Sequence, residues 1–333
     1  MLNNINNFKQ FCEDVKQHKK IKKQSIAFAN AIFEDFMINY EKYCECKVSV
    51  SNVIEICTQA VANSSSVTYA STIYAEGISL LLQYLAFNKM IKESDISNIV
   101  DNINWKQVTL EASIKNTGFV SLDQCISFVK GVVNSIGNME NDALSIIALC
   151  ILFWYFPQKE NKPISMVLKS DCNDVTNTIT CDGVKVKLPI KYYQFIKAFK
   201  TMEHYQGLTT SPRKNSFCMM PSEYLFRGRK KTHLTGQNLT ESIMHFNNIV
   251  TKIIDDKTLN IKGIKNSSFF NMIYENEVSE GRITPLNFTE RAKQVLQERG
   301  IKLTPTMLFY IKDNYFVWKK IYANDLKQEF ANK

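Results

Sequence analysis

Two short basic segments carry side chains that could hold a phosphate. They are KQHKKIKKQ at residues 16–24 and RGRKK at residues 227–231, and the candidate contacts are Lys19, Lys20, Lys22, Lys23, Arg227, Arg229, Lys230 and Lys231. Lysine binds a phosphate oxygen as a point charge, whereas arginine can form two parallel hydrogen bonds. Only six arginines occur in the chain, so two within RGRKK favour contact with phosphate or guanine. A solvated loop or helix end is the alternative interpretation of either segment.

The other residues that could do chemistry do not form a known set. The four histidines lack the spacing of a metal site or a catalytic triad, and no glycine-rich nucleotide-binding motif is present. Cys44 and Cys46 have no second pair at zinc spacing. Nine cysteines without a paired framework favour a reduced compartment. The sequence therefore predicts no metal site, no cofactor and no nucleotide hydrolysis.

The overall composition favours a globular protein with an anionic partner. The 333 residues are 45% hydrophobic and 22% charged, which excludes wholesale disorder and allows two domains. Only 11 Gly and 7 Pro disfavour an all-β sandwich, which needs many turns. The net charge of +9 suits a polyanion, although lysine beside abundant Asn and Ile is also typical of AT-rich coding.

Apolar spacing predicts helices over most of the chain. Apolar residues recur at helical intervals in 26–37 and 80–87. The apolar run 143–156 is too short to span a bilayer and predicts a fully buried core helix that Pro157 ends. Ser121 is a suitable N-cap for a helix just before it.

The pattern changes to that of a small sheet between residues 165 and 189. β-branched residues alternate on both sides of Cys181-Asp182-Gly183, which is typical of a hairpin turn. Helices are expected again from Tyr192 to Met202 and after an N-cap near Thr235. We therefore expect one small antiparallel sheet within an otherwise helical region.

These elements predict a mainly α protein with two domains. Residues 102–120 are polar and show no clear apolar stripe, so we place a linker at 104–120. A helical domain at 1–103 precedes it, and a helical domain at 121–333 that carries the small antiparallel β-sheet follows it.

Several segments occur in the order found in one enzyme family. They are ALCILFWYFPQKENKPISMVLKSD, the hairpin at 180–190, YLFRGRKKTHLT, IKGIKNSSFF and VWKKIYAN. In this order and spacing the chain resembles, from about residue 65, the tyrosine recombinase (phage integrase) family. The resemblance implies an N-terminal core-binding domain, a C-terminal catalytic-like domain and double-stranded DNA as the partner.

The resemblance also assigns the positions of the family's phosphate-binding groups. Glu160 stands where the family has its first arginine. Lys185 matches the lysine of the hairpin, with Lys187 as a near alternative. Lys262 and Lys265 replace the histidine and the arginine of the H-x-x-R box. Because lysine lacks the guanidinium fork, these positions keep the positive charge but not the bidentate grip on the phosphate.

The last two positions of the family lie near the end of the chain. Asp313 stands where a second histidine or a tryptophan belongs, and only Tyr322, at the nucleophile position, is of the expected type. An aromatic residue beside Trp318 is also typical of a helical core, so Tyr322 has a structural interpretation too. With both arginines replaced, the resemblance predicts a degenerate site without catalytic residues, and the protein is not expected to be an enzyme.

The resulting functional hypothesis is sequence-specific DNA binding without strand cleavage, as a transcriptional repressor of phage lysogeny. The pattern of losses is similar to that of recombinase-derived repressors of SPbeta-type temperate phages. A divergent active recombinase that uses Tyr322 and an accessory architectural DNA-binding protein stay open as alternatives. The expected partners are operator DNA and an antirepressor or host regulatory protein. We expect a monomer in the bacterial cytoplasm, associated with the nucleoid, and no membrane partner.

Overall fold

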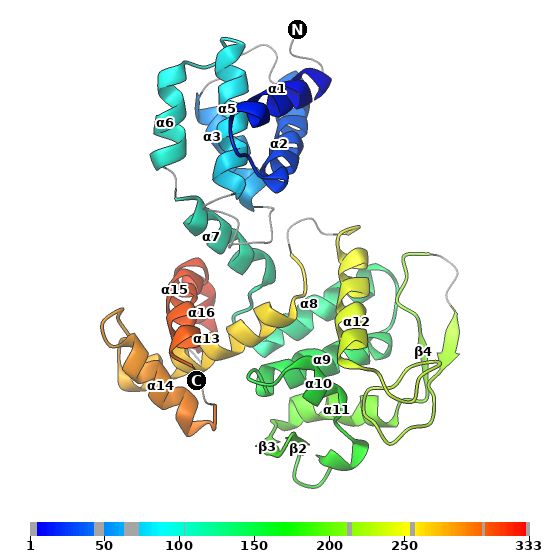
Figure 1. The fold of residues 1–333 in the computed structure, drawn as a ribbon. Helices are drawn as coiled ribbons and strands as arrows, with labels where there is room; N and C mark the ends of the chain where they lie inside the picture. Colours follow the sequence, from blue (N-terminus) through cyan, green and yellow to red (C-terminus); the bar gives the residue numbers. More distant parts are fainter. Residues whose placement is uncertain are drawn as a thin grey trace. The chain divides into compact units, whose positions relative to one another are not determined.

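The computed structural model describes residues 5–42, 50–62, 73–102, 104–211, 215–253, 257–301 and 304–330. The chain is mainly helical, as the sequence predicted, with two small antiparallel sheets in the described residues (Figure 1). It divides into two compact units, Met1–Ser113 and Ile114–Lys333. No helix in these described ranges has both the length and the apolar character that a membrane crossing requires.

The first unit is built around one apolar core. The helices described in it are α1 (Ile5–His18), α2 (Lys23–Lys42), α3 (Val50–Ala62), α5 (Ala75–Phe87) and α6 (Glu93–Asn102). Phe8, Phe33 and Tyr84 meet in the core, and Phe8 stacks on Phe33 with the ring centroids 4.4 Å apart. The apolar spacing of 26–37 and 80–87 predicted α2 and α5, and both helices are confirmed.

The segment predicted as a linker forms a helix, α7 (Trp105–Thr117), within which the boundary between the two units falls. Its apolar residues do not line up on one side, because Leu110 and Ile114 are buried while Val108 is half-buried on another face. A sequence without a one-sided stripe gives no periodic signal, so this helix was not predicted.

The second unit surrounds one fully buried helix, α9 (Leu144–Tyr155). It packs against α8 (Leu122–Ser135), α11 (Ile190–Thr201) and α13 (Ile261–Glu280). Burial on every side explains why its sequence is a continuous apolar run instead of a stripe. The predicted buried helix at 143–156 is therefore confirmed.

Shorter elements and the remaining helices complete the second unit. They are η2 (Glu140–Ala143), α10 (Asn161–Ser165), η3 (Lys169–Asp171), α12 (Gly236–Val250), α14 (Phe288–Glu298), α15 (Pro305–Ile321) and α16 (Ala323–Phe330). The Ser121 hydroxyl caps α8 by accepting from the Gln124 N–H, and the Thr235 hydroxyl caps α12 by accepting from the Asn238 N–H. Both predicted helix starts are confirmed.

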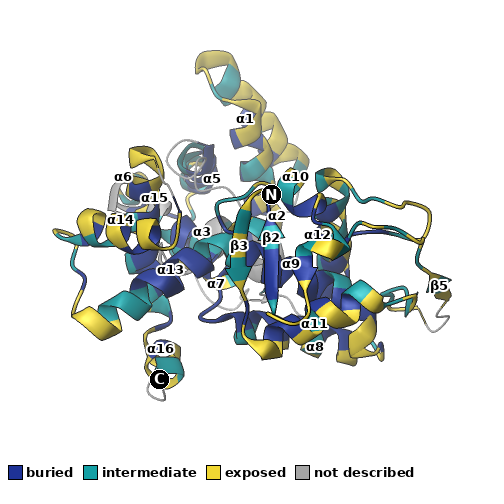
Figure 2. Ribbon diagram, turned by 90° about the horizontal axis from the view of Figure 1, so that it is seen from below, coloured by how far each residue is buried: buried dark blue, intermediate teal, exposed yellow. Residues whose placement is uncertain are grey.

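A three-stranded antiparallel sheet lies where the sequence predicted it. Its strands β1 (Cys172–Asn173), β2 (Thr178–Cys181) and β3 (Val184–Lys187) follow one another in space. Asp182 and Gly183 form the turn with φ of 48° and 76°, which suits a two-residue hairpin loop. Figure 2 shows β2 mostly buried beside a more exposed β3.

A second, two-stranded sheet was not predicted. It pairs β4 (His204–Gln206) with β5 (Ser216–Cys218) in antiparallel register. Neither strand has more than three residues, so neither shows an alternating pattern long enough to indicate a strand.

Candidate functional site

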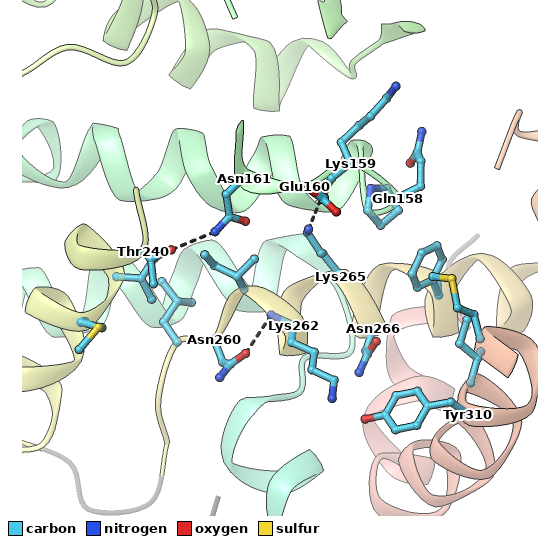
Figure 3. Close-up of a pocket in the computed structure, with 18 of the residues that line it drawn as sticks. Gln158, Lys159, Glu160, Asn161, Thr240, Asn260, Lys262, Lys265, Asn266 and Tyr310 are labelled. Atoms are coloured by element: carbon cyan, nitrogen blue, oxygen red, sulfur yellow. Dashed lines mark hydrogen bonds between the residues drawn. The ribbon is translucent and has the colours of Figure 1, made fainter. Parts of the chain in front are cut away.

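A cleft of about 950 Å³ lies in the second unit, between the end of α9, the start of α13 and one face each of α12 and α15 (Figure 3). Glu160, Lys262 and Lys265 line it. The resemblance had assigned these three positions to one phosphate site, and they come together from distant parts of the chain. We take this cleft as the candidate site.

Side-chain hydrogen bonds hold the walls of the cleft in place. The Asn247 amide bonds both backbone groups of Leu259, at 2.7 Å to the carbonyl and 2.8 Å from the N–H. On the opposite side, the Asn161 amide donates to the Thr240 hydroxyl at 2.9 Å. The Asn260 side chain caps α13. Because these contacts tie α12 to α10 and to the start of α13, the cleft is a preformed feature of the fold.

Lys265 is held inside the protein. Its amine donates to the Lys159 carbonyl at 2.5 Å and lies 5.0 Å from the centroid of the Phe153 ring. Burial lowers the pKa of Lys265, and the nearby Glu160 carboxylate acts in the opposite direction. The Lys159 amine in turn pairs with the Asp182 carboxylate at 2.7 Å. Both lysines are thus compensated by groups of this chain.

Lys262 is more open to solvent. It lies exposed in the first turn of α13, and its amine lies 4.7 Å from the centroid of the Tyr310 ring. Figure 3 shows the Lys262 side chain extending toward Tyr310, which comes from α15. Sequence reasoning missed Tyr310. Its only signal was a place in the apolar run 307–311, which does not reveal which face of the helix reaches the cleft.

Tyr322 does not line the cleft. It is buried after the end of α15, where its hydroxyl donates to the Gly118 carbonyl at 2.8 Å and approaches the Ile114 carbonyl at 3.2 Å. Burial raises the pKa of this phenol. Ile114 lies in the last turn of α7, where its carbonyl also accepts from the Gly118 N–H at 2.7 Å, and Gly118 directly follows the helix, where carbonyls lack helical partners. The phenol is therefore a capping group, which agrees with the structural interpretation of Tyr322.

Lys257 completes the same buried cluster. Its amine donates to the Gly118 carbonyl at 2.7 Å and to the Tyr322 hydroxyl at 3.3 Å, and it lies 4.5 Å from the centroid of the Phe119 ring. Burial lowers the pKa of Lys257 to about 8. The sequence offered no sign that this lysine, among so many, is internal.

Three further positions assigned by the resemblance lie outside the cleft lining. Asp313 is exposed on α15, and Lys185 and Lys187 are exposed on β3. Lys185 stands opposite Thr180 in the hairpin. The ion pair between Lys159 and Asp182 fixes the turn of this hairpin beside the residues that lead to Glu160, but the hairpin lysines themselves do not line the cavity.

Arg227 requires a correction. Its side chain is 4% exposed, and its guanidinium donates to the carbonyls of Met202 at 2.5 Å, Leu225 at 3.3 Å and Lys200 at 3.4 Å. A guanidinium that is buried among carbonyl acceptors has few donors left for a phosphate. The interpretation of Arg227 as a DNA contact is wrong: it joins the end of α11 to the segment before α12.

The rest of the RGRKK segment is exposed. The Arg229 guanidinium lies 4.6 Å from the centroid of the Phe217 ring on β5, and the Lys231 amine donates to the Asn238 side chain at 3.1 Å. Lys230 is exposed beside them. These three cations remain available at the surface, close to the start of α12.

The basic segment of the first unit lies between two helices. Lys19, Lys20 and Lys22 are exposed in the connection from α1 to α2, and Lys23 is exposed at the first residue of α2. The backbone N–H of Lys22 donates to the Glu76 carboxylate at 3.3 Å, which ties this connection to α5. The four amines therefore project from an anchored turn.

The chemistry available in the cleft is that of anion binding. Its ionisable side chains are Lys159, Glu160, Lys262, Lys265 and Tyr310, without an arginine or a histidine. Throughout the ranges that the structure describes, no three His, Cys, Asp or Glu side chains are grouped to hold a metal ion. The Gln158 side-chain oxygen, also in the lining, is buried without a hydrogen-bond partner.

The chain was compared with protein-family models and with curated proteins. No protein-family model matches this chain, and no curated protein matches it either.

Proposed function

We propose that this protein binds specific sites on double-stranded DNA through a tyrosine-recombinase-like fold, does not cleave DNA, and acts as a transcriptional repressor of phage lysogeny. One observation carries the proposal. Glu160, Lys262 and Lys265, assigned to one phosphate site by resemblance, meet in one cleft. These residues come from segments that are far apart in the sequence, yet their side chains line the same cleft.

The composition of the cleft favours binding over cleavage. The anionic Glu160 would repel a phosphate a few ångströms away by about 1 kcal/mol in water, and by more where water is excluded. Removing one charged group that stabilises a transition state commonly costs about 10² or more in rate. In this cleft both arginine positions are occupied by other residues, and the phenol of Tyr322 is buried elsewhere.

DNA binding is tested by fluorescence anisotropy of labelled duplexes from the genomic neighbourhood of the gene. Because lysine contacts release counterions, the affinity should fall with salt by a log–log slope of about −0.9 per phosphate neutralised. Arg229→Gln should weaken binding, and Arg282→Gln, which changes an exposed arginine outside the proposed contacts, serves as the matched control. Affinity that does not change with salt, or no binding to any duplex, would contradict the proposal.

Repression is tested separately from binding. Transcription from a promoter that carries the footprinted site should fall when the protein is added. An accessory architectural protein would occupy the same site and bend it without lowering transcription. Unchanged transcription at saturating protein therefore favours the architectural alternative.

A divergent recombinase is the second candidate, and the position of Tyr310 is the observation in its favour. This tyrosine lines the cleft with the Lys262 amine beside its ring, where Tyr322 does not reach. Attack by the Tyr310 oxygen on phosphorus would release the 5′ hydroxyl and leave a 3′-phosphotyrosine. A nicked suicide substrate would trap that adduct. We expect no adduct; an adduct lost in Tyr310→Phe but kept in Tyr322→Phe would establish the recombinase.

A further inference from the structure

The cleft has an apolar interior beside its charged groups. Four apolar side chains that line it are buried, and two methionines at its edge are exposed: Ile243, Leu259, Phe269, Ile311, Met244 and Met307. A phosphodiester makes no use of such a surface, because its oxygens require hydrogen-bond donors or water. The interior therefore suits the hydrocarbon part of a ligand.

The charged groups of the cleft leave one positive charge uncompensated. Lys159 is paired with Asp182, and Lys265 lies against Glu160 and a backbone carbonyl. Lys262 has no carboxylate within ion-pair distance in the described part of the chain. A single free cation matches a monoanion better than a phosphate dianion.

The volume of the cleft and the fixed position of its walls favour a small molecule as the ligand. The volume of about 950 Å³ lies at the upper end of the usual range for small-molecule pockets, about 300–1,000 Å³. Because Asn247 and Asn161 already hold the walls of the cleft in place, few protein groups need to be ordered when a ligand binds.

We propose that the cleft binds a small monocarboxylate with an apolar body, its carboxylate on Lys262 and its hydrocarbon along Ile243, Met244 and Met307. A second part of the inference rests on the proposed DNA-binding function. Since Lys262 is a proposed phosphate contact, a carboxylate bound to it lowers the affinity for DNA. The degenerate cleft then serves as an effector site.

Isothermal titration calorimetry of the full chain without DNA tests the ligand site, with decanoate as the probe below its micelle concentration. We expect saturable binding at one site per chain. Removal of the charge-assisted contact in Lys262→Gln should weaken it by about tenfold or more. Lys293→Gln, which changes an exposed lysine on α14, should bind decanoate like the unmodified protein. The neutral analogue 1-decanol and inorganic phosphate should bind at least tenfold more weakly than decanoate.

A second variant tests the apolar wall. Met307→Glu places a carboxylate at the exposed edge of the cleft and should abolish decanoate binding by repulsion. Met139→Glu alters another exposed methionine, which does not line the cleft, and is the matched control. Both positions are at the surface, so an unchanged melting temperature should show that both variants fold.

The outcomes separate the ligand site from the proposed function. The ligand site is overturned by the absence of saturable binding, or by binding that neither Lys262→Gln nor Met307→Glu reduces. Decanoate binding that leaves DNA anisotropy unchanged overturns the regulatory part alone. Decanoate binding by a protein that binds no duplex supports the ligand site and rejects the DNA-binding proposal.

Discussion

Two lysine–tyrosine pairs in the second unit have opposite surroundings. Lys262 and Tyr310 meet at an open cleft, where the amine lies over the ring and Tyr310 is 38% exposed. Lys257 and Tyr322 meet inside the protein, where both side chains bond the carbonyl of Gly118. A lysine and a tyrosine thus line an open cleft in the first pair, whereas in the second pair they hold two segments of the chain together by hydrogen bonds.

The comparison shows that residue type and position along the chain do not identify a reactive tyrosine. The resemblance assigned Tyr322 to the position of a nucleophile, yet its hydroxyl is used to cap the end of α7. Tyr310, which the sequence did not single out, is the tyrosine in the cleft. Accessibility and hydrogen-bond partners decide the role of each. Four predictions test this contrast.

The largest expected effect comes from removing each tyrosine side chain. Tyr322→Ala deletes a buried ring and its hydrogen bonds and should cost about 4 kcal/mol, whereas Tyr310→Ala should cost less than about 1 kcal/mol because its ring is partly solvated. The measurement is the melting temperature followed by tryptophan fluorescence. Equal losses of stability in the two variants would contradict the distinction between a structural tyrosine and a tyrosine that lines the cleft.

The second prediction concerns pH and Lys257. Its pKa falls from the ordinary value of 10.5 to about 8 in the folded protein, so folding is penalised while the amine is charged. Between pH 8 and 10.5 the unfolded chain binds more protons, and stability from this group therefore rises with pH by about 3 kcal/mol.

Urea unfolding of Lys257→Met at pH 7.5 and pH 10.5 measures this contribution. The variant should lack the rise, while the titrations of the buried tyrosines and cysteines cancel in the difference between variant and unmodified protein. Lys262→Met, which replaces an exposed lysine by the same residue, is the matched control. An identical pH dependence in all three proteins would show that Lys257 is not internal.

A smaller effect is expected when only the buried hydroxyl is removed. Tyr322→Phe keeps the ring but leaves the Gly118 carbonyl with one donor fewer, which should cost about 1–2 kcal/mol. DNA affinity should not change, because the phenol does not reach the cleft. A loss of DNA affinity in a variant that remains folded would place Tyr322 in the binding site after all.

The smallest effect is expected for Tyr310→Phe. Because Tyr310 is exposed, its hydroxyl can bond water, and the stability should stay within about 0.5 kcal/mol of the unmodified protein. Urea unfolding at pH 7.5 is sufficient to check this. A loss comparable to that of Tyr322→Phe would mean that the cleft tyrosine is also a structural group.

The sequence predicted local structure best where one physical signal was strong. The continuous apolar run gave the buried α9, the side chains of Ser121 and Thr235 marked two helix starts, and Asp182-Gly183 marked the hairpin turn. It failed where the signal was weak. The polar α7 has no apolar stripe, and the strands β4 and β5 are too short to alternate.

The site could be predicted only in part. Of the positions that the resemblance assigned to one site, Glu160, Lys262 and Lys265 line one cleft, whereas Lys185, Lys187, Asp313 and Tyr322 do not line it. The resemblance could not show that Arg227 is buried among carbonyls. Nor could it show that Tyr310 faces the cleft, since neighbouring residues of a helix point in different directions and tertiary packing selects the buried face.

The sequence by itself determined the helical class, the small hairpin sheet and the excess of positive charge. These properties follow from composition, periodicity and residue identity, which are local. Tertiary structure alone decided which lysines are half-buried, which arginine is internal and which tyrosine meets the cleft. Burial and hydrogen-bond partners arise from contacts between segments far apart in the chain, and no local pattern records those contacts.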